Sequence, residues 1–266
     1  MEDHCREVVI RGNALSVRTR FLCLFAVLAA AVGSVQAQDR RPPVGGVGSA
    51  PDAMIFYVAH GAPGACGEGC SDWIAAEGIV QWDTHKRLFA VLDRQAGRKL
   101  PIIIHTWGES HLNVATSLGR ILRERGLDAS AGPTEVAACM GKSEPECFAL
   151  KRPGGPLDAA VNTSAARCDL ACVLILSGGV HRRLPAGTKI VLGGMQIANR
   201  LGLNVSEERR EGLSVKFGDQ FRLYLRDMGI DPQLLGVVDD NSEHSRQTEL
   251  PPSDWQRLRL VNAPFL

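Results

Sequence analysis

The sequence lacks an excess of charge of either sign. Its 266 residues include 30 lysines and arginines against 29 aspartates and glutamates, a formal net charge of +1. This balance gives no electrostatic reason to expect a nucleic acid or an anionic surface as a partner. Aromatic residues are also scarce, at 5%, whereas there are 28 glycines, a composition typical of a turn-rich α/β protein. The length fits one globular domain with at most a small appendage.

Long hydrophobic runs are almost absent. One run, residues 21–32, has 12 apolar residues, fewer than the ~20 that an ordinary membrane span needs. Arg18 and Arg20 precede this run and Val35-Gln36-Ala37 follows it. Residues 1–37 therefore have the parts of a secretory signal peptide, with cleavage after Ala37; the alternative is an uncleaved membrane anchor.

No later segment is apolar and long enough to cross a bilayer, so we expect an exported protein without membrane contact after cleavage. Its location would be the periplasm of a bacterium or the medium outside the cell. Residues 38–53 are rich in proline, glycine and arginine and have no periodicity, which predicts a disordered leader. The folded domain is then expected to span residues 54–266.

Cysteine usage agrees with export. Cys5 and Cys23 lie in the predicted signal peptide, and an even number remains, which indicates disulfides outside the cytoplasm. The spacing suggests Cys66 with Cys70, Cys139 with Cys147, and Cys168 with Cys172, although sequence alone leaves other pairings open. The alternative is a zinc site of four thiolates, but zinc cysteines are usually spaced more tightly. We therefore predict disulfides, no metal and no cofactor.

The hydrophobic pattern predicts strands that alternate with helices. Residues 101–105 form a short apolar run, 106–111 are turn residues, and 112–126 have apolar side chains at helical spacing. This strand–turn–helix order predicts a parallel sheet with right-handed crossovers. We further expect an extended insertion at 133–166 and a surface turn at 181–185. The other predicted elements are strands at 53–59, 73–80 and 188–195 and helices at 84–96 and 207–228.

Two later segments carry a resemblance to a known family. They are Cys168-Asp169-Leu170-Ala171-Cys172 and Val191-Leu192-Gly193-Gly194-Met195-Gln196. They resemble the catalytic core of the Clp-protease/crotonase superfamily, in a branch of predicted bacterial periplasmic proteins. That branch usually has Cys-x-Ser-Ala-Cys in the first segment, with serine as nucleophile, and Gly-Val-His-Gln in the second, with histidine as base. Here the two positions hold Leu170 and Met195, which have the family's separation of 25 residues.

A third segment also departs from the family. In the family the turn that corresponds to residues 106–111 contains two glycines, whose backbone amides form the oxyanion hole. Aligned from Leu118-Gly119-Arg120, the two glycine positions fall on Glu109 and Ser110. A carboxylate at this place would oppose the negative charge that an oxyanion hole stabilises.

The resemblance implies a spiral of ββα units around a mostly parallel sheet, with a helical C-terminal arm. It also implies homo-oligomers, which are common among such domains. With Leu170 and Met195 packed together on the floor of the cleft, we expect no catalysis there. The cleft would instead hold an extended peptide or protein segment along a strand edge.

An α/β-hydrolase is the alternative. His60-Gly61-Ala62-Pro63-Gly64 resembles the oxyanion loop of that class, and Gly108-Glu109-Ser110-His111-Leu112 resembles its nucleophile elbow. Ser110 would attack, His244 would be the base, and Asp240 or Asp239 would orient it. Leu112 at the second glycine position argues against this, as does the spacing of Asp240 and His244, which share what we expect to be a polar loop. His105 is interpreted as a core histidine.

Overall fold

The central strands are apolar on both faces. In the computed structural model, which describes residues 52–194, 205–244 and 246–264, β1 (Ile55–His60) pairs antiparallel with β2 (Asp72–Gly78). Both strands are almost wholly buried, and their side chains alternate between two hydrophobic clusters, one on each side of the sheet. A strand covered on both faces needs continuous apolar residues, which explains why this stretch has no alternating pattern.

The predicted signal peptide, residues 1–37, lies outside the described residues, as does the predicted leader up to residue 51. Ala53, at the end of that leader, is buried and forms a parallel bridge with Ile79. The Ile79 N–H also donates to the Asp52 carbonyl at 2.9 Å. Ordered structure therefore includes the last two residues of the expected leader.

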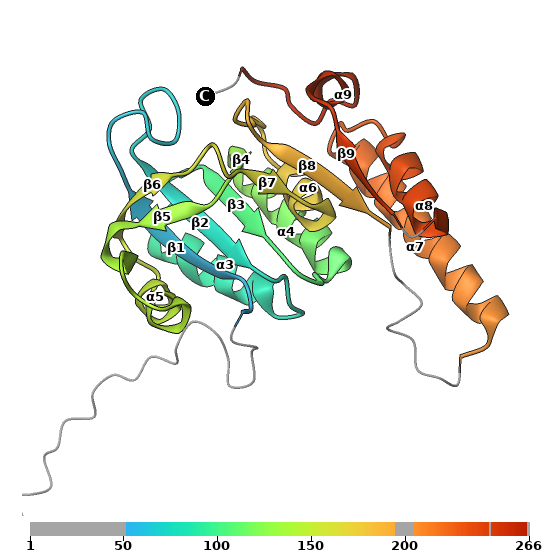
Figure 1. The fold of residues 1–266 in the computed structure, drawn as a ribbon, viewed down its shortest axis with the longest axis horizontal. Helices are drawn as coiled ribbons and strands as arrows, with labels where there is room; N and C mark the ends of the chain where they lie inside the picture. Colours follow the sequence, from blue (N-terminus) through green and yellow to red (C-terminus); the bar gives the residue numbers. More distant parts are fainter. Residues whose placement is uncertain (1–51, 195–204, 245, 265–266) are drawn as a thin grey trace, which may run out of the picture. The chain divides into compact units, whose positions relative to one another are not determined.

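The main sheet has six strands in the order β4-β3-β2-β1-β6-β5 (Figure 1). Pairs β2–β3, β3–β4 and β1–β6 are parallel, and pairs β1–β2 and β5–β6 are antiparallel. The predicted α/β class with a mostly parallel sheet is thus confirmed. The additional strands are β3 (Ile102–Thr106), β4 (Ala129–Ala131), β5 (Thr134–Val136) and β6 (Leu157–Val161).

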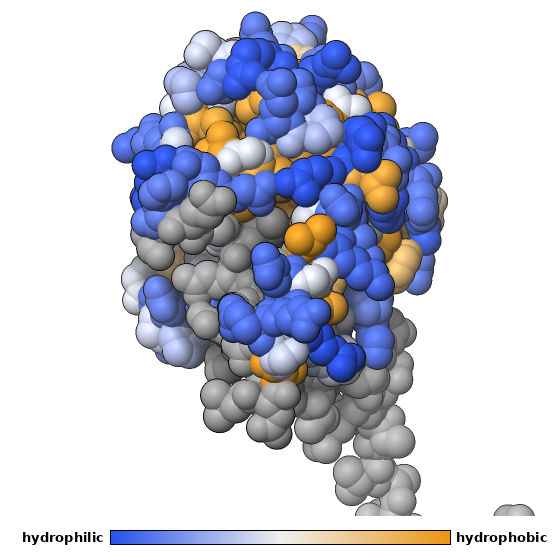
Figure 2. All heavy atoms as spheres, turned by 90° about the vertical axis from the view of Figure 1, so that its right-hand side faces the viewer, coloured by the Kyte–Doolittle hydropathy of each residue, from blue (hydrophilic) through white to orange (hydrophobic). Residues whose placement is uncertain are grey.

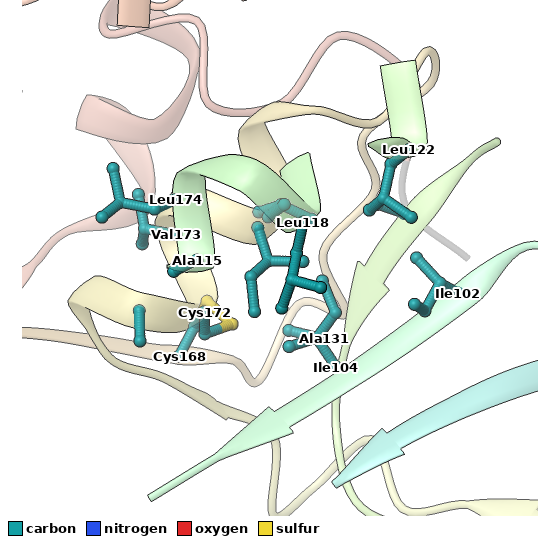
Figure 3. Close-up of a cluster of buried hydrophobic side chains, with 14 of the residues drawn as sticks. Ile102, Ile104, Ala115, Leu118, Leu122, Ala131, Cys168, Cys172, Val173 and Leu174 are labelled. Atoms are coloured by element: carbon teal, nitrogen blue, oxygen red, sulfur yellow. A yellow bond between two sulfur atoms is a disulfide. The ribbon is translucent and has the colours of Figure 1, made fainter. Parts of the chain in front are cut away.

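Three helices cover one face of this sheet. They are α3 (Thr84–Arg94), α4 (Leu112–Arg125) and α6 (Leu170–Ser177). Figure 3 shows Ile102 and Ile104 of β3 pointing toward Leu118 and Leu122 of α4. Helix α4 ends as predicted at Gly126, whose φ of 67° is a left-handed conformation that favours glycine. Helix α6 is buried along its whole length.

Residues 133–166, which we expect to be an insertion, cover the opposite face of the sheet. They form β5, the short helix η2 (Ala137–Cys139), α5 (Glu144–Lys151) and β6. Only Gly132 and Pro133 separate β4 from β5, yet these strands are at opposite ends of the strand order, so the sheet curls back over itself. The indole N–H of Trp73 in β2 donates to Thr134 Oγ1 of β5 at 3.1 Å. Figure 1 shows β5 and β6 in front of β1–β3.

A second sheet and three helices form the C-terminal part. The sheet has the order β7-β8-β9, with β7 (Arg167–Cys168), β8 (Lys189–Gly193) and β9 (Gln247–Leu250). The helices are α7 (Glu207–Asp227), α8 (Leu234–His244) and α9 (Pro252–Arg257). Hydrophilic residues cover most of the side of the molecule drawn in Figure 2, with hydrophobic residues between them.

The outer edge of β4 is also covered. Residues 180–183 lie along this edge, where Ala129 forms a parallel bridge with Arg182. The Ala129 N–H donates to the His181 carbonyl at 2.9 Å, and the Arg183 N–H donates to the Ala129 carbonyl at 3.0 Å. The segment predicted as a surface turn is therefore part of the packed structure, because its backbone extends the hydrogen bonding of the sheet.

The six cysteines among the described residues form the three disulfides suggested by their spacing: Cys66–Cys70, Cys139–Cys147 and Cys168–Cys172. This pairing uses all the thiols that the alternative zinc site would need, and no group of three or more metal-binding side chains occurs among the described residues. Three disulfides are compatible with an exported protein. No helix in the described part of the chain is long and apolar enough to span a membrane.

Two arginines bind the carboxyl end of α6. Arg123 donates to the carbonyls of Ser177, Gly178 and Gly179 at 3.0–3.2 Å. Arg182, only 4% exposed, donates to the Gly179 carbonyl at 3.1 Å and to two carbonyls of the C-terminal tail. Burial, together with the charge of Arg123, lowers the pKa of Arg182 to about 10, so the side chain stays protonated at neutral pH.

We predict that Arg182→Ala lowers the free energy of unfolding by about 3 kcal/mol, because several buried carbonyls lose their donor. Urea unfolding followed by circular dichroism measures this loss. Arg257→Ala is the control, since Arg257 lies on the surface of α9 and pairs with Asp254; its unfolding midpoint should hardly move. Equal midpoints for the two variants would contradict the role given to Arg182.

Candidate functional site

The carboxyl ends of β2 and β3 meet the turn at residues 106–111. Gly108 in this turn has a φ of 66°, and Trp107 is 40% exposed. The Val80 N–H donates to Ser110 Oγ at 3.0 Å, and the His111 N–H donates to the Val80 carbonyl at 2.9 Å. These bonds hold the turn against the segment that follows β2. Ligands of open α/β sheets commonly bind at the carboxyl ends of parallel strands, which makes this turn a candidate site.

The amino end of α6 lies beside the same turn. Asp169 is its N-cap, and Asp169 Oδ1 accepts hydrogen bonds from the Cys172 N–H at 2.9 Å and from Thr106 Oγ1 at 2.6 Å. One carboxylate oxygen thus caps the helix and joins it to the end of β3. Leu170, 8% exposed, is the first residue of α6 and so lies at this junction. Met195, its expected partner, lies outside the described residues.

The buried carboxylate of Glu77 lies near the place where α6 meets the end of β3. Glu77 of β2 is 6% exposed and accepts hydrogen bonds from Tyr57 Oη at 3.0 Å, from the Thr134 N–H at 3.1 Å and from Lys151 Nζ at 2.6 Å. The three donors come from β1, β5 and α5. Burial, reinforced by the negative charge of Glu77, raises the pKa of Tyr57. The carboxylate therefore ties both layers of the curled sheet together.

His105 lies directly beside Glu77 in the parallel pairing of β3 with β2. Its Nδ1 is buried and has no hydrogen-bond partner among the described residues. Its ring centroid lies 5.2 Å from that of Trp107 in the turn. Burial lowers the pKa of His105, and the positive charges of Lys151 and Arg167 lower it further. The negative charges of Glu77 and Asp169 act in the opposite direction. A neutral imidazole has one donor and one acceptor nitrogen, so His105 can donate a hydrogen bond to a ligand or accept one from it.

The three residues of the alternative triad lie in two elements. Ser110, 9% exposed, lies in the turn before α4, whereas Asp240 and His244 are one helical turn apart on α8. Their side chains are 46% and 56% exposed and pair at 3.4 Å, and Asp240 also pairs with Arg246. The loop expected for Asp240 and His244 is thus a helix, and their closeness follows from helical spacing.

Sequence reasoning missed the polar residues that hold the site, namely Glu77, Thr106, Lys151 and Asp169. Glu77 carried a usable signal, because a carboxylate inside an otherwise apolar strand requires a buried partner. Lys151 could not be identified as this partner from local pattern. No protein-family model matches this chain, and no curated protein matches its sequence.

Replacement of Lys151 by Met should lower the free energy of unfolding by about 3–5 kcal/mol, since it leaves Glu77 buried without its cation. The double variant Glu77→Gln with Lys151→Met removes both charges and should recover much of this loss. Thermal and urea unfolding of the natural protein, the two single variants and the double variant give the coupling free energy between the two side chains. Additive effects would contradict a coupled buried pair.

His105 should make stability depend on pH. Because its folded pKa lies below the unfolded value of about 6.5, the unfolded state binds more protons between these two values. Stability is then fully present above pH 6.5 and falls as the pH drops toward the folded pKa. Urea unfolding across this range should show that the free energy of unfolding depends less on pH in His105→Gln than in the natural protein. The same slope in both proteins would count against a depressed pKa at His105.

Proposed function

We propose that this protein is an exported, non-catalytic member of the Clp-protease/crotonase-like superfamily. It acts as a binding or assembly module for peptide or protein segments, in the periplasm or outside the cell. The proposed fold is the spiral of ββα units of that superfamily, and the proposed assembly is a homo-oligomer. No cofactor and no metal takes part in this role.

The position of Leu170 is the observation that carries the proposal. Leu170 begins α6, and the bond between Thr106 and Asp169 joins the start of this helix to the turn after β3. In the resembling family, nucleophile and oxyanion hole occupy these two segments. An aliphatic side chain cannot attack a carbonyl or exchange a proton, so this position supplies no nucleophile.

The turn supports the same conclusion. Glu109 and Ser110 stand at the positions where the family has its two glycines. Ser110 Oγ already accepts a hydrogen bond from the Val80 N–H inside the protein. A buried hydroxyl in this position stabilises the turn, and the adjacent carboxylate opposes an oxyanion. Export is supported by the three disulfides.

A fluorophosphonate probe tests the absence of a reactive serine. We expect no labelling of the folded natural protein, with a known serine hydrolase labelled in parallel. Labelling at Ser110 would overturn the proposal in favour of the alternative hydrolase. Peptide mapping by mass spectrometry identifies the labelled position.

Restoring both polar groups tests the alignment itself. The double variant Leu170→Ser with Met195→His should react with the probe at position 170, because the hydroxyl regains a base. Each single variant is the matched control and should stay unreactive. Leu170→Ser also removes buried apolar atoms, at a cost of about 2–4 kcal/mol, so circular dichroism must first show that the variants are folded. A folded but inert double variant would contradict the proposed positions.

A further inference from the structure

An open groove of about 700 Å³ lies away from Leu170, on the outer side of β5 and β6. The loop at His60–Pro63 forms one wall, and the segment from Val136 to Met140 forms the other. Glu135, Asp158, Ala159 and Ala160 line it between these walls. Sites that bind small molecules or short segments commonly have about 300–1,000 Å³. The volume of the groove lies in this range.

Two carboxylates share one face of this surface. In the antiparallel pair, Glu135 lies opposite Ala160, and Asp158 lies two residues before Ala160. Because side chains of a strand alternate, Glu135, Asp158 and Ala160 point to the same side, and all three are exposed. Two residues along a strand correspond to about 7 Å, which is the expected offset between the two carboxylates.

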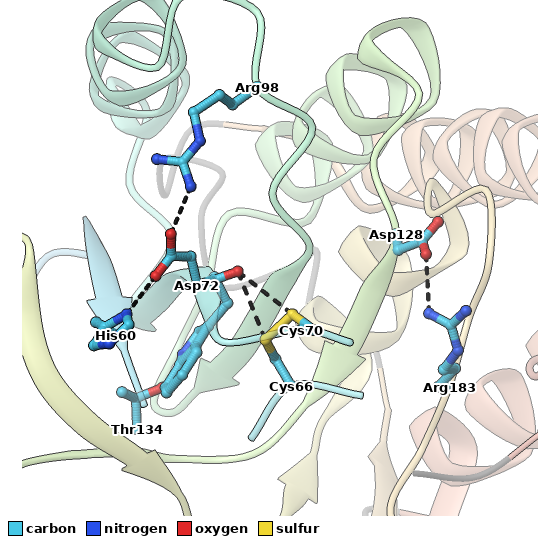
Figure 4. Close-up of a disulfide and its surroundings, with 9 residues drawn as sticks. His60, Cys66, Cys70, Asp72, Arg98, Asp128, Thr134 and Arg183 are labelled. Atoms are coloured by element: carbon cyan, nitrogen blue, oxygen red, sulfur yellow. Dashed lines mark hydrogen bonds and ion pairs between the residues drawn. A yellow bond between two sulfur atoms is a disulfide. The ribbon is translucent and has the colours of Figure 1, made fainter. Parts of the chain in front are cut away.

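Among the residues that the structure describes, no cation pairs with these two carboxylates. Glu135 accepts a hydrogen bond from the amide of Asn162 at 2.6 Å, and Asp158 has no hydrogen bond or ion pair among the described residues. His60, the basic side chain in the lining, pairs with Asp72 at 2.6 Å, and Asp72 also pairs with Arg98 (Figure 4). The groove is therefore acidic and can accept positive charge from a partner.

Each wall of the groove is fixed by a disulfide. Cys66–Cys70 closes the loop that follows His60, and the Gly64 N–H in this loop donates to the Cys70 carbonyl at 2.9 Å. Cys139–Cys147 fastens η2 to α5 beside Met140. Walls that are held in place before binding lose little conformational entropy when a ligand arrives. Two of the three disulfides thus pre-organise the groove.

Met140 supplies an unusual apolar contact. It is 82% exposed, although it is a large hydrophobic residue, and it stands on the rim next to a fixed disulfide. Methionine is adaptable and recurs at surfaces that bind varied peptides. Together with Pro63, Ala62 and Ala160, it gives the groove an apolar surface between the charges.

We infer that this groove binds an extended polypeptide segment with basic side chains two residues apart and a small apolar side chain two residues beyond them, all on one face. The two basic groups pair with Glu135 and Asp158, and the apolar side chain packs on Met140. An extended segment fits because its side chains repeat every two residues at the spacing of the two carboxylates. This inference rests on the proposed binding role and names the chemical class of the partner.

Fluorescence anisotropy with a labelled peptide tests the inference. The probe is acetyl-Gly-Arg-Gly-Lys-Gly-Val-Gly-amide carrying a fluorophore, and the control peptide has glutamate in place of both basic residues. We expect the basic peptide to bind and the acidic peptide not to bind. Glu135→Gln with Asp158→Asn should weaken binding about tenfold, since two exposed ion pairs are lost. Met140→Ser should also weaken it, by about tenfold, through lost apolar contact.

The matched control is Asp93→Asn with Glu124→Gln, which removes two exposed carboxylates from α3 and α4. If this control variant weakened peptide binding equally, the attraction would be a general effect of charge and the inference would be overturned. Failure of the peptide to bind at low ionic strength would also overturn it. A change of oligomeric state in the groove variants, seen by light scattering, would identify a second copy of the chain as the occupant and overturn it too. Labelling by the fluorophosphonate probe does not depend on the groove residues. The outcome for the proposed function is therefore distinguishable from the outcome for the groove.

Discussion

Everything in this fold depends on a short helix that has no polar face. All eight residues of α6 are buried, and apart from the Cys168–Cys172 disulfide, other parts of the chain bond it at its ends and through its backbone carbonyls. Asp169 caps its amino end, Arg123 and Arg182 bind its last carbonyls, and Tyr224 Oη donates to the Leu174 carbonyl at 2.6 Å. These donors come from α4, from the segment after α6 and from α7, so parts of the chain that are distant in sequence are connected through α6. The amino end of the same helix presents Leu170 to the candidate site.

The two faces of the main sheet differ in kind. Helices α3, α4 and α6 pack on one face mostly through hydrophobic side chains, although buried Arg87 of α3 donates to the Met54 carbonyl at 2.7 Å. The face under β5 and β6 contains the Glu77 carboxylate and its donors. Buried polar groups must be satisfied, and this requirement fixes how β5 and α5 lie on the sheet. The candidate site lies at the border of these two faces, next to His105 and Thr106. Its polar side chains come from β2, β3, α5 and the N-cap of α6.

Local pattern predicted strands β1, β2, β3 and β8 and helices α3, α4 and α7, and it predicted the disulfides. Helix α4 illustrates why, since its apolar spacing and its glycine stop lie within the sequence of the helix itself. Contacts between distant residues could not be predicted in this way. Trp73 bonds Thr134 across 61 positions, and no local signal indicated that residues 133–166 would supply two strands. Arg182 was assigned to a surface turn for the same reason, because its environment is made by packing. Asp240 is exposed as expected, but its segment is helix α8, which buried Asn241 holds on β8 by donating to the Leu192 carbonyl.

Residues 180–183 cover the outer edge of β4, and this limits the pairing of that edge with a strand of another molecule. An exposed, long strand at the border of a sheet can recruit a strand from another molecule and so start aggregation. Here Ala129 already bonds His181 and Arg183, which removes that template at one border. At the other border stands β5, which has just three residues and a charged side chain at its centre. With these two borders, the main sheet leaves little exposed backbone for cross-β growth.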